Sequence, residues 1–269
     1  MTRILAIVVL MLWLPLATAQ NKQVEVQWFG HSAFEIKTLS GKLILIDPFL
    51  TNNPKTPEKY KSYINYSNVD LILITHAHAD HVGDAIDLAK RYNIPVYAPP
   101  GLSDTFTSLG LLPEKLAPKF NKGGSIYPLG KEIKITMTHA EHSSEFRWKN
   151  PATGKGEIHE GGEPVGYILK LENGFTIYDM GDTGLFGDMA LIADYYKPDM
   201  VLIPIGGNYT MDPVDAAYAL DKFLHPKYAI PMHYGTFPVL TGTVAELRKA
   251  LKSDDIKVLD MVPGDTLKF

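Results

Sequence analysis

The densest group of residues that could do chemistry lies between positions 76 and 81. His76, His78, Asp80 and His81 are separated only by alanines, and Thr75 precedes them. In an extended segment residues i and i+2 point to the same side, so His76 and His78 can bind one ion. Asp80 and His81 follow where the chain turns into the next helix and can present a second ligand pair. Four such side chains at the end of an apolar strand argue against an ordinary polar loop and predict a metal site.

One cluster cannot complete two coordination spheres, so other parts of the chain must supply further ligands. Three candidates each follow a strand-like run: His142, Asp182 in a Gly-Asp-Thr motif, and His233. A single histidine or aspartate more often forms a structural hydrogen bond, but three at corresponding places favour ligation. The segment 138–142 also contains His139. Because both histidines lie beyond the strand, periodicity leaves either of them open as the ligand.

These residues need strands that end at a common edge. Hydrophobic patterning predicts strands over 24–28, 33–36, 43–46, 70–74, 94–97, 133–137, 165–171, 175–178, 200–205 and 228–231. It predicts helices over 82–92, 102–109, 185–195, 212–224 and 244–251. The stretch from Ser143 to Pro164 is expected to be a long functional loop. Strands followed by mixed strands and helices predict an α/β sandwich of two sheets with helices outside.

Composition narrows the class of protein. The 269-residue chain has a net charge of −4 and no cysteine. A mildly acidic chain has no electrostatic reason to bind nucleic acid or anionic membranes, so we expect a small-molecule substrate. Without cysteine, any metal must be held by nitrogen and oxygen ligands. The composition leaves the oligomeric state open.

The N-terminus has the pattern of a secretory signal peptide over residues 1–19. A basic start with Arg3 precedes the apolar run 4–14, and Ala17-Thr18-Ala19 fits a cleavage site. A membrane-spanning helix would need about 20 apolar residues, more than this run contains. We therefore expect an exported protein, periplasmic or secreted, with one domain over 20–269 and no stable membrane insertion after cleavage.

The His-x-His-x-Asp-His pattern at 76–81 resembles the core motif of the metallo-β-lactamase superfamily. The similarity extends over nearly the whole mature chain and implies the four-layer αββα sandwich of that fold. Segments 28–32, 142–144, 206–211 and 232–237 resemble a branch of largely uncharacterised metal-dependent hydrolases near the ascorbate-6-phosphate lactonase group.

The resemblance also implies two sets of ligands for two divalent cations. The first set is His76, His78 and His142, where His142 fits the family's His-Ser-Ser pattern; the second set is Asp80, His81 and His233. Asp182 would bridge the two cations, and Asp47 would brace the motif loop without binding metal. We expect Asp80, Asp182 and His31 to be the catalytic residues. For His31, which would orient a ligand or meet substrate, a purely structural role is equally open.

The expected chemistry is hydrolysis of an ester, lactone or phosphodiester bond by a hydroxide activated by two metals. Zinc suits imidazole and carboxylate ligands, and manganese or iron would also fit. A β-lactamase is one alternative, but the resemblance implies that true lactamases lack the bridging Asp182. A redox member of the fold would have Glu in place of His78. A non-catalytic member that only binds metal would lack a ligand, and none is missing here.

Overall fold

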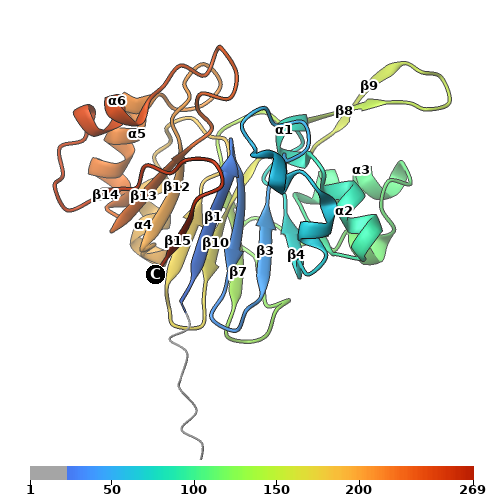
Figure 1. The fold of residues 1–269 in the computed structure, drawn as a ribbon, viewed down its shortest axis with the longest axis horizontal. Helices are drawn as coiled ribbons and strands as arrows, with labels where there is room; N and C mark the ends of the chain where they lie inside the picture. The colour runs from blue at the N-terminus through green and yellow to red at the C-terminus, as the bar shows by residue number, and fades with distance from the viewer. Residues whose placement is uncertain (1–22) are drawn as a thin grey trace, which may run out of the picture.

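Two β-sheets pack face to face, and helices cover the outer face of each (Figure 1). The computed structural model describes residues 23–269, and the predicted signal peptide lies outside the described residues. The predicted four-layer αββα sandwich is confirmed by this arrangement. Among residues 23–269, no helix is both long and apolar enough to cross a membrane.

The first sheet joins the N-terminal strands to the last strand of the chain. In spatial order it contains β15 (Thr266–Lys268), β1 (Glu25–Gly30), β2 (Ala33–Lys37), β3 (Leu43–Ile46), β4 (Leu71–Leu73) and β5 (Val96–Tyr97). The β3–β4 and β4–β5 pairs are parallel, and the other pairs are antiparallel. The short strand β15 was not predicted, because its three residues carry no pattern of their own.

The second sheet holds the later strands. In spatial order it contains β14 (Lys257–Val258), β13 (Tyr228–Met232), β12 (Met200–Pro204), β11 (Thr176–Asp179), β10 (Val165–Lys170), β7 (Lys134–His139) and β6 (Ser125–Ile126). Strands β11 to β14 run parallel. The predicted hairpin between β10 and β11 is confirmed, with Asn173-Gly174 in its turn.

Helices form the two outer layers. The first sheet is covered by α1 (Ala79–Val82), α2 (Ala85–Tyr92) and α3 (Pro100–Ser108), with the short helices η1 (Glu58–Tyr60), η2 (Tyr63–Tyr66) and η3 (Glu114–Leu116) nearby. The second sheet is covered by α4 (Met189–Tyr196), α5 (Pro213–Ala219), the π-helical turn η4 (Leu220–Leu224) and α6 (Val244–Ala250). The predicted cap of α5 is confirmed, since the Asp212 side chain accepts hydrogen bonds from the backbone N–H groups of Val214 and Asp215.

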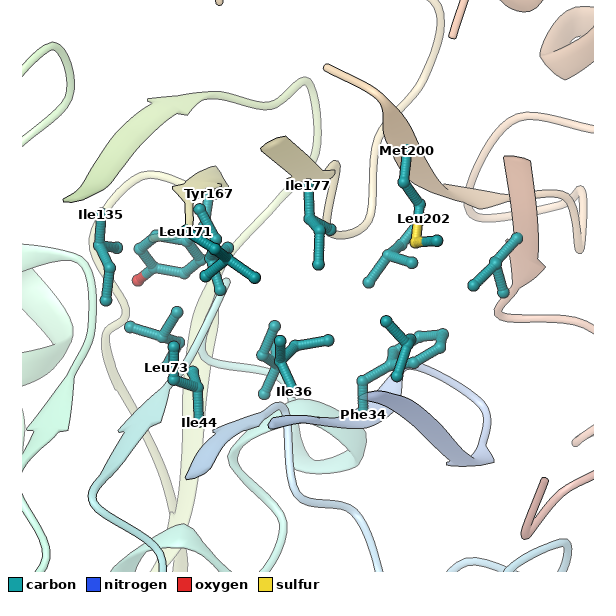
Figure 2. Packing of buried hydrophobic residues seen from close by; sticks show 14 of the residues in the cluster. Phe34, Ile36, Ile44, Leu73, Ile135, Tyr167, Leu171, Ile177, Met200 and Leu202 are labelled. Carbon is teal, nitrogen blue, oxygen red and sulfur yellow. The ribbon is translucent and has the colours of Figure 1, made fainter. Parts of the chain in front are cut away.

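The main core lies between the two sheets. Figure 2 shows Phe34, Ile36 and Leu73 of the first sheet facing Tyr167 and Ile177 of the second. All five are fully buried, and each such side chain contributes about 1.5–3 kcal/mol when removed from water. This packing holds the two sheets, and therefore their strand ends, in one fixed relation.

Two predictions about local structure are wrong. The stretch Ser143 to Pro164 is not an irregular loop, because it contains a hairpin of β8 (Glu145–Lys149) and β9 (Gly156–Glu160) that projects from the sandwich (Figure 1). Its alternation places Phe146 and Trp148 on one face. The predicted helix 82–92 is broken at Gly83, which separates α1 from α2.

Glu35 is an acidic residue on the face of β2 that packs under the helical layer, between the buried Ala33 and the exposed Lys37. It lies opposite Leu45 of β3, beneath the helical layer. Burial raises the pKa of the Glu35 carboxyl from its usual 4.5 to about 7, although Lys37 opposes the shift and Glu25 adds to it. The folded protein therefore favours the neutral carboxyl, whereas the unfolded chain ionises it more readily.

We expect Glu35→Gln to remove a pH-dependent loss of stability. Because the folded pKa is the higher one, this group's stabilising contribution is complete below about pH 4.5 and is lost as the pH rises to about 7. Between pH 5 and pH 8 the variant should gain about 1–3 kcal/mol in free energy of unfolding relative to wild type. Urea unfolding at both pH values measures this difference. The exposed Glu58→Gln variant is the control, and parallel behaviour of Glu35→Gln and wild type would contradict the prediction.

Candidate metal centre

The predicted ligands meet at one edge of the sandwich, where strands from both sheets end. Strand β4 leads into the loop that carries His76 to His81. Strands β7, β11 and β13 of the second sheet end shortly before His142, Asp182 and His233. Residues separated by more than 150 positions are thereby brought together, because the packed sheets align their strand ends.

The first group of potential ligands consists of His76, His78 and His142. One nitrogen from each lies within 4.8 Å of the others. The Nε2 atom of His76 is 2.9 Å from the Nδ1 atom of His78. The ring of His142 is 5.0 Å from that of His76 and 5.1 Å from that of His78. Three imidazoles thus converge on one point.

The second group contains Asp80, His81 and His233, together with His31. The Nε2 atom of His31 is 3.1 Å from the Asp80 carboxylate, and its Nδ1 atom is 3.0 Å from the Thr236 hydroxyl. Burial, with a smaller contribution from His233, lowers the pKa of His31 to about 4. His31 is therefore neutral at pH 7 and lies directly beside the second group.

Asp182 lies between the two groups. Its Oδ2 atom is 2.9 Å from the Nε2 atom of His233, 3.3 Å from that of His81 and 3.7 Å from that of His142. The distance to the Nε2 atom of His76 is 3.9 Å. Burial alone would raise the pKa of this carboxyl, but His233 and His81 outweigh burial and hold the pKa well below its usual range. An ionised carboxylate therefore occupies the position expected of a bridging ligand.

Asp47 stabilises the loop that carries His76 to His81 by hydrogen bonds. Its carboxylate accepts hydrogen bonds from the backbone N–H of Thr75 at 2.8 Å and from the Thr75 hydroxyl at 2.6 Å. It also lies 2.7 Å from the Nδ1 atom of His81. Since a carboxylate only accepts, His81 donates through Nδ1 and its Nε2 atom is turned toward Asp182.

Several residues around the centre have backbone conformations that are rare for residues other than glycine. His31, Asp47 and His233 all have positive φ angles, of 58°, 42° and 54°. Such positions cost on the order of 1 kcal/mol or more each and concentrate at functional sites. Gly83, at φ 43°, lets the chain turn after His81, because a Cβ atom there would lie 2.4 Å from the Pro48 carbonyl oxygen.

The chemistry of the cluster fits divalent cations. Buried polar atoms almost always have a hydrogen-bond partner, yet His81 Nε2, His142 Nε2 and Asp182 Oδ1 have none. Imidazole nitrogens with carboxylate oxygens are a donor set suited to zinc and similar metals. The side chains of His78 and Asp80 are 28% and 29% exposed, so the cluster is open to solvent on their side.

The structure brings His142, and not His139, to the cluster. His139 is 42% exposed, lies 3.2 Å from the Glu141 carboxylate and belongs to neither group of potential ligands. The other six predicted ligands converge together with His142. Sequence reasoning missed Thr75, Thr236 and Glu145, of which Glu145 lies 3.3 Å from the Nε2 atom of His78. Of these three, only Glu145 lies in a segment with a local pattern, the alternation over residues 145–149, which indicates a strand and not the contact with His78.

Comparison with known proteins identifies the family. The family model of the beta-lactamase superfamily domain matches residues 42–234, well over half of the chain. The chain belongs to this superfamily. A relative from Polynucleobacter asymbioticus, named UPF0173 metal-dependent hydrolase, is 54% identical over 256 residues, covering 95% of this chain and 89% of the relative.

More distant superfamily members agree. A relative of the same name from Roseiflexus castenholzii is 42% identical over 249 residues, covering 92% of this chain and 98% of the relative. The solved structure of Igni18, a metallo hydrolase from the archaeon Ignicoccus hospitalis, is 33% identical with a TM-score of 0.77, covering 92% of this chain and 98% of Igni18. The predictions of a metallo-β-lactamase superfamily member and of a metal-dependent hydrolase are confirmed.

We expect Asp47→Asn to destabilise the protein by about 3 kcal/mol. The amide cannot serve as the acceptor of three hydrogen bonds from buried donors, so Thr75 or His81 loses its partner. Urea unfolding in the presence of a chelator measures this loss independently of metal. The control is Asp194→Asn on the exposed face of α4, which should change stability by less than about 0.5 kcal/mol. Equal effects of the two substitutions would contradict the bracing role.

Proposed function

We propose that this superfamily member is an exported hydrolase that uses two divalent cations to cleave an ester, lactone or phosphodiester bond of a small molecule. The observation that carries the proposal is the convergence of two groups of potential ligands around the buried carboxylate of Asp182. Export rests on the signal-peptide pattern of residues 1–19, and a periplasmic or secreted location follows from it.

The ligand assignment follows the two groups. His76, His78 and His142 would hold the first cation, Asp80, His81 and His233 the second, and Asp182 would contact both. Zinc is the preferred cation, and manganese or iron also suits nitrogen and oxygen donors. When bound, a divalent cation supplies acidity, because it lowers the pKa of a coordinated water from 15.7 to about 7.

Residues around the proposed ligands orient them for that reaction. Asp47 holds the ring of His81 in one orientation, and His31 fixes Asp80 through their 3.1 Å contact. Substrate would enter on the solvent-open side, where His78 and Asp80 are partly exposed. Ester, lactone and phosphodiester bonds are cleaved by water here, so no serine, cysteine or lysine nucleophile is needed. His31 is thus a positioning residue.

We expect His142→Ala to lose bound metal and to reduce activity by more than about 100-fold. Substituting residues that only contact the ligands typically costs about 10–100-fold in metal affinity or activity, and removing a ligand should cost more. Asp182→Asn should lose activity similarly, because it removes the charge between the two groups. His139→Ala is the matched control, being close in sequence and outside the cluster. Elemental analysis combined with a panel of ester, lactone and phosphodiester substrates measures both effects. Full metal content and activity in His142→Ala would refute the ligand assignment.

We expect nitrocefin to be cleaved far more slowly than lactone or phosphodiester probes. The carboxylate of Asp182 lies between the two metal positions, as the bridging aspartate of the non-lactamase hydrolases does, and the family resemblance implies that true β-lactamases lack this aspartate. Comparing kcat/KM values for the three probe classes on the same metal-loaded preparation tests this ranking. Efficient nitrocefin turnover would instead favour the β-lactamase alternative.

A further inference from the structure

The β8–β9 hairpin begins directly at the candidate metal centre. Its first residue, Glu145, places an Oε2 oxygen 3.3 Å from the Nε2 atom of His78. The Ser143 hydroxyl lies 3.4 Å from the same nitrogen. The Nε2 atom of His78 therefore faces the hairpin, and its Nδ1 atom faces His76.

The contact with Glu145 determines which nitrogen of His78 carries the proton. A carboxylate can only accept, so the Nε2 atom of His78 must donate, and its Nδ1 atom keeps a free lone pair. Which nitrogen of a metal-binding histidine is free is set by the hydrogen bond at the other one. The lone pair on Nδ1 points toward the Nε2 atom of His76, 2.9 Å away.

His76 is fixed in the complementary state. The Thr75 hydroxyl donates its proton to Asp47, so its oxygen can only accept from the Nδ1 atom of His76, 3.1 Å away. The Nε2 atom of His76 therefore also has a free lone pair. Two lone pairs that face each other at 2.9 Å repel unless a cation lies against both. Glu145 thus keeps the Nδ1 atom of His78 free to bind a metal, and Thr75 does the same for the Nε2 atom of His76.

Hydrogen bonds join the base of the hairpin to the loop that carries His76 to His81, so the backbone at Glu145 is held beside His78. The Ser144 hydroxyl accepts from the backbone N–H of Ala77 at 3.1 Å and donates to the carbonyl of Gly161 at 2.9 Å. Gly161 packs so tightly that a Cβ atom would lie 1.9 Å from the Ser144 carbonyl oxygen and 2.5 Å from the Ala77 Cβ atom. The Thr105 hydroxyl of α3 donates to the Glu160 carbonyl at 2.6 Å.

We propose that Glu145 is a positioning residue that accepts a hydrogen bond from the Nε2–H of His78 and so keeps the Nδ1 atom free to bind a cation. This inference rests on the proposed metal site. It gives the β8–β9 hairpin a role in that site, namely to hold the carboxylate that sets the tautomer of His78. Carboxylates behind metal-binding histidines typically contribute 10–100-fold to metal affinity.

The test compares Glu145→Ala, Glu145→Gln and a matched control. Zinc affinity is measured by competition with a chromophoric chelator, and the tautomer of His78 by ¹⁵N NMR of the metal-free, histidine-labelled protein. Glu145→Ala should bind zinc about 10–100-fold more weakly and show a mixture of His78 tautomers. Glu145→Gln keeps an acceptor oxygen, so it should retain the Nε2–H tautomer and stay within roughly threefold of wild type.

The control is Glu157→Ala, which removes another glutamate–histidine contact from the same hairpin. Glu157 lies 3.0 Å from the Nε2 atom of His159, away from the cluster. Its loss should leave zinc affinity and the His78 tautomer unchanged. Equal losses of affinity in Glu157→Ala and Glu145→Ala would show a general effect of the hairpin and overturn the proposal. Equal losses in Glu145→Gln and Glu145→Ala would assign the effect to charge and overturn the hydrogen-bond role.

The two proposals fail in distinguishable ways. If wild type binds zinc and Glu145→Ala binds it equally well, the role of Glu145 is refuted and the metal site stands. If wild type binds no metal, the proposed function fails. The tautomer measurement still decides the role of Glu145 in that case, because it uses metal-free protein. An unchanged Nε2–H tautomer in Glu145→Ala would refute that role.

Discussion

The buried carboxylate of Asp182 needs positive charge around it, and the site is organised by that need. The side chain is 2% exposed, and its Oδ2 atom lies within 4 Å of four histidine nitrogens. Burying an unpaired carboxylate costs several kcal/mol, which neutral imidazoles offset only in part. A proton on His81 and a bound cation are two ways to supply the charge. Metal binding at such a centre is therefore expected to release protons.

The same geometry couples the site to the sandwich. His76 to His81 belong to the first sheet's edge, whereas His142, Asp182 and His233 follow strands of the second sheet. A cation held by ligands from both sheets would join them, in addition to the apolar core between them. Ligands that bind only the folded state stabilise it by an amount that rises with the logarithm of their concentration over Kd. Such a cation would also offset the conformational strain at His31 and His233, which lie where the two sheets meet.

Local sequence patterns predicted most strands, the start of α5 and the position of the metal-binding motif. The alternating and apolar runs indicated most of the strands of both sheets, and Asp212-Pro213 indicated the start of α5. The dense motif at 76–81 indicated where the chemistry lies, because few other functions place four metal-capable side chains so closely. These signals come from neighbouring residues, so they can be recognised without knowing the fold.

The features that were missed depend on contacts between distant residues. Glu145 is separated from His78 by 67 positions and Thr236 from His31 by 205. Neither contact leaves a mark in the local sequence around either partner. The choice between His139 and His142 is of the same kind, since His139 is the last residue of β7 and His142 follows only three residues later. It is the packing of Asp182 and the 76–81 loop against that strand end that brings His142 inward, while His139 contacts Glu141 at the surface. Local patterning therefore indicates which residues are available for chemistry, and the packing of the sheets selects those that take part.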